Sequence, residues 1–158
     1  MRIYISGPLQ GSTDLATARR FYDALALLIR DAGHEAYVPH HSTDPVAAAG
    51  LPAQVVFATD LAALNSADAI IAHVGLPSTG VGAELALATA SGRRVLGIKR
   101  PGEKGSRFAE GLIADGGGQV RTFADEQELR EAVRNWLRMP AAWFGRPESI
   151  EPHRKVVA

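Results

Sequence analysis

The chain has 158 residues, the size of one domain that can bury a core of its own. Lysine plus arginine and aspartate plus glutamate number 17 each, so the chain lacks the basic excess with which proteins hold polynucleotides. The absence of cysteine excludes disulfides, thiolate chemistry and zinc sites built on cysteine. No apolar run approaches the ~20 residues of a membrane span, and a first strand expected from residue 2 leaves no room for a signal peptide. We therefore expect a cytoplasmic protein.

The first unit of the chain is a strand followed by an amphipathic helix. The β-branched and aromatic run at 2–6 predicts a central strand that ends at Gly7. After a polar loop, apolar residues recur at helical spacing from 15 to 32, and a glycine then ends the helix. Ser12 or Thr13 is expected to cap this helix at its start.

The second unit contains two adjacent histidines. Residues 34–38 predict a short strand, and the following segment at 39–45 is too rich in turn residues to continue it. His40 and His41 could suggest a metal site, but no third ligand stands at a recognisable spacing. The segment is therefore interpreted as a solvated or substrate-facing loop. An apolar helix is expected to follow at about 54–65.

Two acids lie among apolar residues. Asp60 belongs to the apolar helix, which makes it less obviously a surface acid than Asp68. Glu84 belongs to the segment 76–90, which combines a glycine-rich turn with a helix that is apolar on nearly every side and is expected to be mostly buried. We expect Glu84 in the first turn of that helix, beside amide groups that attract anions. An acid at such a position often does no more than complement the helix dipole.

Two familiar glycine motifs do not fit the turn that precedes Glu84. The run at 80–85 has Leu85 where the dinucleotide fingerprint has its third glycine. The chain also lacks the Gly-Lys-Ser/Thr sequence of a phosphate-binding loop. The turn is nevertheless open enough for a ligand to approach its backbone.

The rest of the chain predicts two more units and a tail. The expected elements are a strand at 95–98, a short helix at 106–114, a strand at 119–123 and a helix at 126–137. Asp125 and Glu128 form a capping box at the start of the last helix. We expect a domain at 1–138 and a C-terminal tail at 139–158, in which Trp143 and its neighbour pack either on the domain or on a second subunit.

Strands alternating with helices predict a doubly wound five-stranded parallel sheet with helices on both faces, a Rossmann- or flavodoxin-like α/β fold. Ligands of such sheets bind beyond the carboxyl ends of the strands. Three loops, at 7–12, 39–42 and 73–84, are therefore expected to converge on one cleft, with Tyr4 near its floor.

Three segments of the chain resemble the nucleoside 2-deoxyribosyltransferase superfamily. They are IYISGPL at 3–9, DL at 60–61 ahead of ADAIIA at 67–72, and PSTGVGAEL at 77–85. Within the superfamily, the chain is most similar to the 2′-deoxynucleoside 5′-phosphate N-hydrolase branch, and the similarity runs in order over about residues 2–136. The third segment is the specific part of the resemblance.

The resemblance implies a covalent mechanism. Glu84 would attack the anomeric carbon of the sugar, held ionised by the helix start and the loop amides. Asp60 would lie near the base and assist its protonation or activate water, and Tyr4 would contact the sugar and orient Glu84. The substrate-binding positions are expected at Gly7, Leu9, His40, Ser78, Gly80 and Gly82. No cofactor or metal is implied, and the partners are a nucleoside or nucleotide and a second copy of the chain that completes the site.

The chain departs from the hydrolase pattern where the 5′-phosphate is held. Pro8 and Gln10 stand in place of a serine and an arginine, and Glu110 falls where the adjacent subunit offers a serine. The cations that could substitute are Arg19, Arg20 and Arg107. Three hypotheses follow: an N-glycosidase of (2′-deoxy)nucleoside 5′-monophosphates, a transferase that exchanges bases between 2′-deoxynucleosides, and a non-catalytic nucleotide-binding module.

Overall fold

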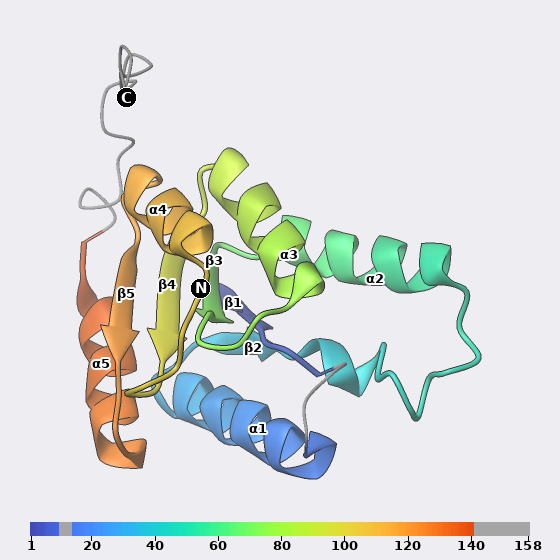
Figure 1. Ribbon diagram of the computed structural model, residues 1–158, viewed down its shortest axis with the longest axis horizontal. Helices are drawn as coiled ribbons and strands as arrows, with labels where there is room; N and C mark the ends of the chain where they lie inside the picture. The colour runs from blue at the N-terminus through green and yellow to red at the C-terminus, as the bar shows by residue number, and fades with distance from the viewer. Residues whose placement is uncertain (10–13, 141–158) are drawn as a thin grey trace.

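The computed structural model describes residues 1–9 and 14–140, which fold around one parallel sheet (Figure 1). Its strands in chain order are β1 (Arg2–Ser6), β2 (Glu35–Tyr37), β3 (Ala69–His73), β4 (Arg94–Lys99) and β5 (Gln119–Thr122). The strand order across the sheet is β2-β1-β3-β4-β5, and every neighbouring pair is parallel. The predicted doubly wound five-stranded sheet is therefore confirmed, with β1 in its interior.

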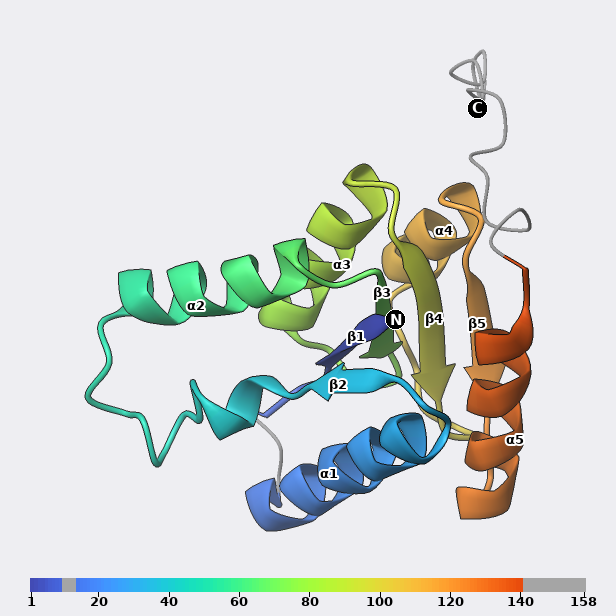
Figure 2. The same ribbon diagram turned by 180° about the vertical axis from the view of Figure 1, so that it is seen from behind.

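Helices cover both faces of this sheet, as Figures 1 and 2 show from opposite sides. They are α1 (Leu15–Asp31), the 3₁₀ helix η1 (Pro39–His41), α2 (Ala53–Asn65), α3 (Thr79–Ala90), α4 (Arg107–Asp115) and α5 (Glu126–Arg138). Helices α1 and α5 pack on one face and α3 and α4 on the other, whereas α2 extends away from the sheet. Each face thus has a separate apolar core.

The alternation of side chains along β1 decides which residues meet which helices. Ile3 and Ile5 point into the core under α1 and α5, and Tyr4 points into the core under α3. Ser6, two residues beyond Tyr4, shares its face because side chains alternate along a strand. Two hydroxyls of β1 therefore face α3 at the carboxyl end of the sheet.

Side-chain caps begin most of the helices, although not always with the residue expected. The N-cap of α1 is Asp14, which accepts a hydrogen bond from the Thr17 amide at 2.9 Å, and not the Ser12 or Thr13 predicted, which lie outside the described residues. Asp125 caps α5 as predicted and accepts from the Glu128 amide at 2.9 Å. In a standard capping box the Glu128 carboxylate would accept a hydrogen bond from the amide of the cap residue Asp125. Here it accepts instead from the amide of residue 124, at 2.7 Å.

Helices α2 and α3 are more exposed than their apolar sequences predict. Only Val81, Leu85 and Ala88 of α3 are buried, and Leu87 is 42% exposed. The expectation of a mostly buried helix is therefore wrong for the single chain. An apolar helix that leaves one face open within its own domain often meets another subunit there.

Two predictions from the sequence, the domain division and the cytoplasmic location, are not tested by the described residues. Trp143 and most of the tail lie outside the described residues, so the division into 1–138 and 139–158 remains a prediction. Among the helices of residues 1–9 and 14–140, none combines the length and the apolar character that a membrane crossing requires. The cytoplasmic location also remains a prediction.

Candidate active site

A cavity of about 470 Å³ opens at the carboxyl end of β1, where loops from distant parts of the chain meet. Six of the predicted site residues line it: Gly7, Leu9, Asp60, Ser78, Gly80 and Glu84. The segment after β2 adds Pro39, Thr43 and Asp44 to the wall. The three loops that the sequence predicts to converge all contribute residues to this cavity.

Two hydroxyls of β1 hold the Glu84 carboxylate in this cavity. The Tyr4 hydroxyl donates to Oε1 at 2.7 Å, and the Ser6 hydroxyl donates to Oε2 at 2.5 Å. Each oxygen thus has one hydroxyl donor and keeps further lone pairs for a ligand. This fixes the orientation of the carboxylate towards the cavity.

The position of Glu84 in its helix differs from the prediction. Helix α3 begins at Thr79 after the Ser78 cap, so Glu84 lies in the second turn and not in the first. Its hydrogen bonds come from hydroxyls of β1 instead of the amides at the helix start. Burial raises the pKa of Glu84, the bonds from Ser6 and Tyr4 partly oppose that rise, and the nearby charge of Asp60 adds to it.

Tyr4 lies beneath the cavity and not in its wall. Its side chain is fully buried and stacks on Tyr37 with 5.4 Å between the ring centroids. Burial and the adjacent Glu84 raise its pKa, so the phenol keeps its proton and acts as a donor. The Tyr4 hydroxyl therefore contacts Glu84, whereas its buried ring does not line the cavity, and the role of Tyr4 stays a prediction.

Two hydroxyls also hold the Asp60 carboxylate, those of Thr43 and Tyr37. The Thr43 hydroxyl lies 3.0 and 2.9 Å from its two oxygens, and the Tyr37 hydroxyl donates to Oδ1 at 3.2 Å. Burial raises the pKa of Asp60, while the bonds from Thr43 and Tyr37 partly oppose that rise. Asp60 is partly buried, whereas Asp68 is exposed, in agreement with the contrast drawn from the sequence.

Three residues that serve the carboxylates were missed from the sequence. Ser6 could have been found, because it stands two residues after Tyr4 on one strand. Tyr37 pairs in register with Tyr4 across β1 and β2, so it could be found only once the strand order was known. Thr43 follows η1 in an irregular segment, and no local pattern indicates its contact with Asp60.

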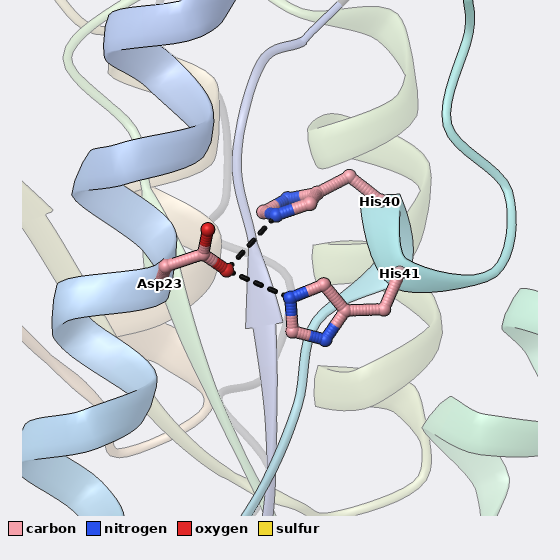
Figure 3. Close-up of side chains that lie close together, drawn as sticks. All are labelled: Asp23, His40 and His41. Carbon is pink, nitrogen blue, oxygen red and sulfur yellow. Dashed lines mark hydrogen bonds and ion pairs between the residues drawn. The ribbon is translucent and has the colours of Figure 1, made fainter. Parts of the chain in front are cut away.

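Two predicted binding residues lie outside the wall of the main cavity. His40 is buried, and its Nε2 lies 3.0 Å from an oxygen of Asp23 on α1 (Figure 3). Gly82 lines a smaller hollow between α3 and α4, on the other side of Val81. The histidine segment therefore meets the cavity through its flanking residues Pro39 and Thr43.

Two of the charged residues discussed for the 5′-phosphate, Arg19 and Glu110, form ion pairs within the chain. Arg19 forms an ion pair with Asp44, and its Nε lies 2.6 Å from Oδ2 of that residue. Glu110 pairs with Lys99 at 2.6 Å. Asp44 is buried, and the guanidinium of Arg19 holds the pKa of its carboxyl at about 2. The ion pair between Arg19 and Asp44 thus supports one wall of the cavity.

Paired carboxylates in different surroundings are the arrangement with which proteins cleave glycosidic bonds, since one acts as nucleophile and the other carries a proton. The fold and the site together define an α/β enzyme of glycosidic-bond chemistry. A family model described as nucleoside 2-deoxyribosyltransferase matches residues 3–132, and the chain belongs to this family.

Curated relatives and solved structures agree with this assignment. A protein from Methanosarcina mazei named "Putative 2'-deoxynucleoside 5'-phosphate N-hydrolase 1" is 34% identical over 140 residues, which cover 86% of this chain and 83% of the relative. A protein of the same name from Methanosarcina barkeri is 29% identical, with 86% and 84% covered.

Two solved structures share the fold. A CMP N-glycosidase from Clostridium botulinum superposes with a TM-score of 0.65 at 19% identity, covering 86% of this chain and 99% of that one. A 2-deoxyribosyltransferase from Bacillus psychrosaccharolyticus gives a TM-score of 0.63 at 22% identity, with 94% and 100% covered.

Proposed function

We propose that the protein is an N-glycosidase that cleaves the base–sugar bond of (2′-deoxy)nucleoside 5′-monophosphates through a covalent glycosyl-Glu84 intermediate. The observation that carries this proposal is the Glu84 carboxylate, which two hydroxyls hold in one cavity with Asp60. The size of the cavity, about 470 Å³, suits a ligand of mononucleotide size. The names of the Methanosarcina relatives support the same substrate class.

In the first step, an oxygen of Glu84 bonds to the anomeric carbon while the bond from that carbon to the base nitrogen breaks. The electron pair of the broken bond leaves with the base, which takes a proton from Asp60. Burial raises the pKa of Asp60, which favours the protonated form that this step needs. Tyr4 and Ser6 keep Glu84 aimed at the sugar.

In the second step, water attacks the anomeric carbon and displaces Glu84 as a carboxylate. Asp60, now ionised, takes the proton of that water, so each cycle consumes one water and returns both acids to their starting forms. If a second base attacked in place of water, the same intermediate would give transfer.

A transferase acting on unphosphorylated 2′-deoxynucleosides is the second candidate, and the charges near the cavity favour it. Pro8 offers no hydroxyl, Arg19 is paired with Asp44, and Lys99 is paired with Glu110. A phosphate that bound Arg19 or Lys99 would have to compete with these carboxylates.

Base release from nucleosides and their 5′-monophosphates, each with and without a second free base, separates the candidates. Release confined to monophosphates and indifferent to the acceptor supports the hydrolase, whereas exchange products from deoxynucleosides support the transferase. Loss of release in both Glu84→Ala and Asp60→Asn is expected for either. A parent protein that binds mononucleotides without releasing base would leave only the non-catalytic binding module.

We also propose that the site is completed in a homodimer through α2. Phe57 and Leu51 line the cavity, yet Phe57 is 62% and Leu51 38% exposed in the single chain. Val55 on the same helix is 43% exposed. A second copy that covers these side chains would bury apolar surface and close the cavity wall at the same time.

Analytical ultracentrifugation of Phe57→Asp tests the dimer. The variant is expected to sediment as a monomer and to lose base release, because a carboxylate does not desolvate in an apolar interface. Leu27→Asp is the matched control, since Leu27 is 58% exposed on α1 and does not line the cavity, and this variant should stay dimeric and active. A monomeric parent protein with full activity would contradict the proposal.

A further inference from the structure

A second cluster of polar side chains includes the two histidines and lies outside the lining of the cavity. Asp23 comes from the middle of α1, and His40 and His41 come from η1 (Figure 3). The Nε2 atoms of His40 and His41 lie 3.0 and 2.7 Å from the same oxygen of Asp23. Two imidazole nitrogens thus approach one carboxylate oxygen, and the three atoms all lie within 4.8 Å of one another.

This cluster differs from an ordinary buried histidine with satisfied hydrogen bonds. The ring of His40 is 5% exposed, and its Nδ1 has no hydrogen-bond partner among the described residues. The buried His73, by contrast, has Tyr22 on one ring nitrogen at 3.2 Å and Glu103 on the other at 3.0 Å. The His40 ring is thus oriented by a shared carboxylate oxygen and not by a complete hydrogen-bond network.

We propose that Asp23, His40 and His41 form a binding site for a divalent transition-metal ion, with Zn²⁺ the best match. Imidazole nitrogen with one carboxylate oxygen is a ligand set that suits zinc, and three protein ligands leave a fourth position for water. This third ligand is the one that the sequence did not indicate, because Asp23 lies 17 residues before His40.

Two of the three distances between the ligand atoms need only small changes to accept the ion. Zinc–ligand bonds of about 2.0–2.2 Å in a tetrahedron place neighbouring ligand atoms about 3.4 Å apart. The two nitrogen–oxygen distances, 3.0 and 2.7 Å, must therefore widen by less than about 1 Å. His41 and Asp23 are free to make this adjustment, since their side chains are 48% and 46% exposed.

The ion would tie the histidine segment to α1. Arg19 and Asp23 stand one turn apart on α1. Arg19 pairs with Asp44 and Asp23 contacts His40, so both residues of α1 hold the histidine segment. The same segment carries Thr43, which binds Asp60. A bound ion would therefore stabilise the wall of the cavity without entering it. Since an outer partner for a ligating histidine contributes about 10- to 100-fold in affinity, the unpartnered His40 Nδ1 predicts weaker binding than in a closed structural site.

Titration of the tag-free, chelator-treated protein tests the site directly. Zn²⁺ in a calorimeter and Co²⁺ followed by its visible absorption are expected to saturate at one ion per chain, and Zn²⁺ should raise the melting temperature. Asp23→Ala and His41→Ala are expected to weaken binding at least tenfold. His34→Ala is the control, because His34 lies outside the cluster and contacts the N-terminal amine.

Both cluster variants replace partly exposed side chains, and circular dichroism checks that they fold. The proposal is overturned if the parent protein shows no saturable binding up to about 1 mM zinc, the millimolar limit of weak binding. It is equally overturned if folded Asp23→Ala and His41→Ala bind as the parent does. None of these readouts uses turnover, so the result is independent of the proposed reaction.

Discussion

Replacing Tyr4 with phenylalanine removes one hydroxyl from the Glu84 carboxylate and keeps the ring that stacks on Tyr37. The lost bond is charge-assisted, 2.7 Å long and largely shielded from water. Hydrogen bonds of this kind contribute about 1.5–3 kcal/mol net. Because the bond stabilises the ionised form of Glu84, its loss raises the pKa of that carboxyl further.

The expected result is a defect that depends on pH. Glu84, the proposed nucleophile, must be ionised to react, so the acidic limb of the kcat/KM profile is expected to move to higher pH in Tyr4→Phe. On that limb kcat/KM should fall about 10- to 100-fold, since about 1.4 kcal/mol corresponds to a factor of ten. At pH values where Glu84 is ionised in both proteins, the loss should be much smaller.

The assay is base release from the preferred substrate over the full stable pH range. Tyr37→Phe is the matched control, because it removes the hydroxyl that donates to Asp60 at 3.2 Å and leaves both bonds to Glu84. It should spare the acidic limb. An unchanged acidic limb in Tyr4→Phe, or an equal loss at every pH, would refute the idea that Tyr4 controls the ionisation of Glu84.

Three further predictions follow from the contacts around the site. Thr43→Val removes a hydrogen-bond donor to the Asp60 carboxylate and so raises the pKa of Asp60 further. The alkaline limb of the kcat profile should therefore move to higher pH, and an unmoved limb would argue against Asp60 as the proton donor. Glu84→Gln should raise the melting temperature at pH 7, because the pKa of Glu84 is higher in the folded than in the unfolded protein and the parent therefore loses stability as pH rises above the unfolded-state pKa. The difference in melting temperature from the parent should shrink towards pH 4. A variant that melts below the parent at pH 7 would contradict the effect of burial on this pKa. Asp44→Asn should lower the free energy of unfolding at neutral pH by about 1–2 kcal/mol, moderated by solvent at Arg19. Because the pKa of Asp44 is about 2 in the folded protein and 3.8 ordinarily, this contribution to stability is present above about pH 4 and is lost as pH falls through 2. Urea unfolding at several pH values measures the difference between the variant and the parent. A difference that does not change with pH would contradict the ion pair as its source.

Local patterns in the sequence were sufficient to predict the elements and to single out Glu84 as a candidate site residue. Alternation and helical spacing depend on neighbouring residues, so the five strands and their helices could be predicted within a few residues. The glycine-rich turn before Glu84 indicated a ligand site, and the resemblance of 77–85 to a family supplied its chemistry. The turn assignment of Glu84 failed because helix α3 starts directly after the Ser78 cap, earlier than the glycine-rich pattern suggested.

The tertiary structure decided which side chains serve the two acids. Tyr4 and Glu84 are 80 residues apart and meet because β1 lies beside β3 in the sheet and α3 packs on that face. The convergence of Asp23 with the two histidines depends on how the segment after β2 runs back over α1. The spacing of residues along the chain does not predict these long-range contacts, because the contacts depend on the strand order and on the paths of the loops.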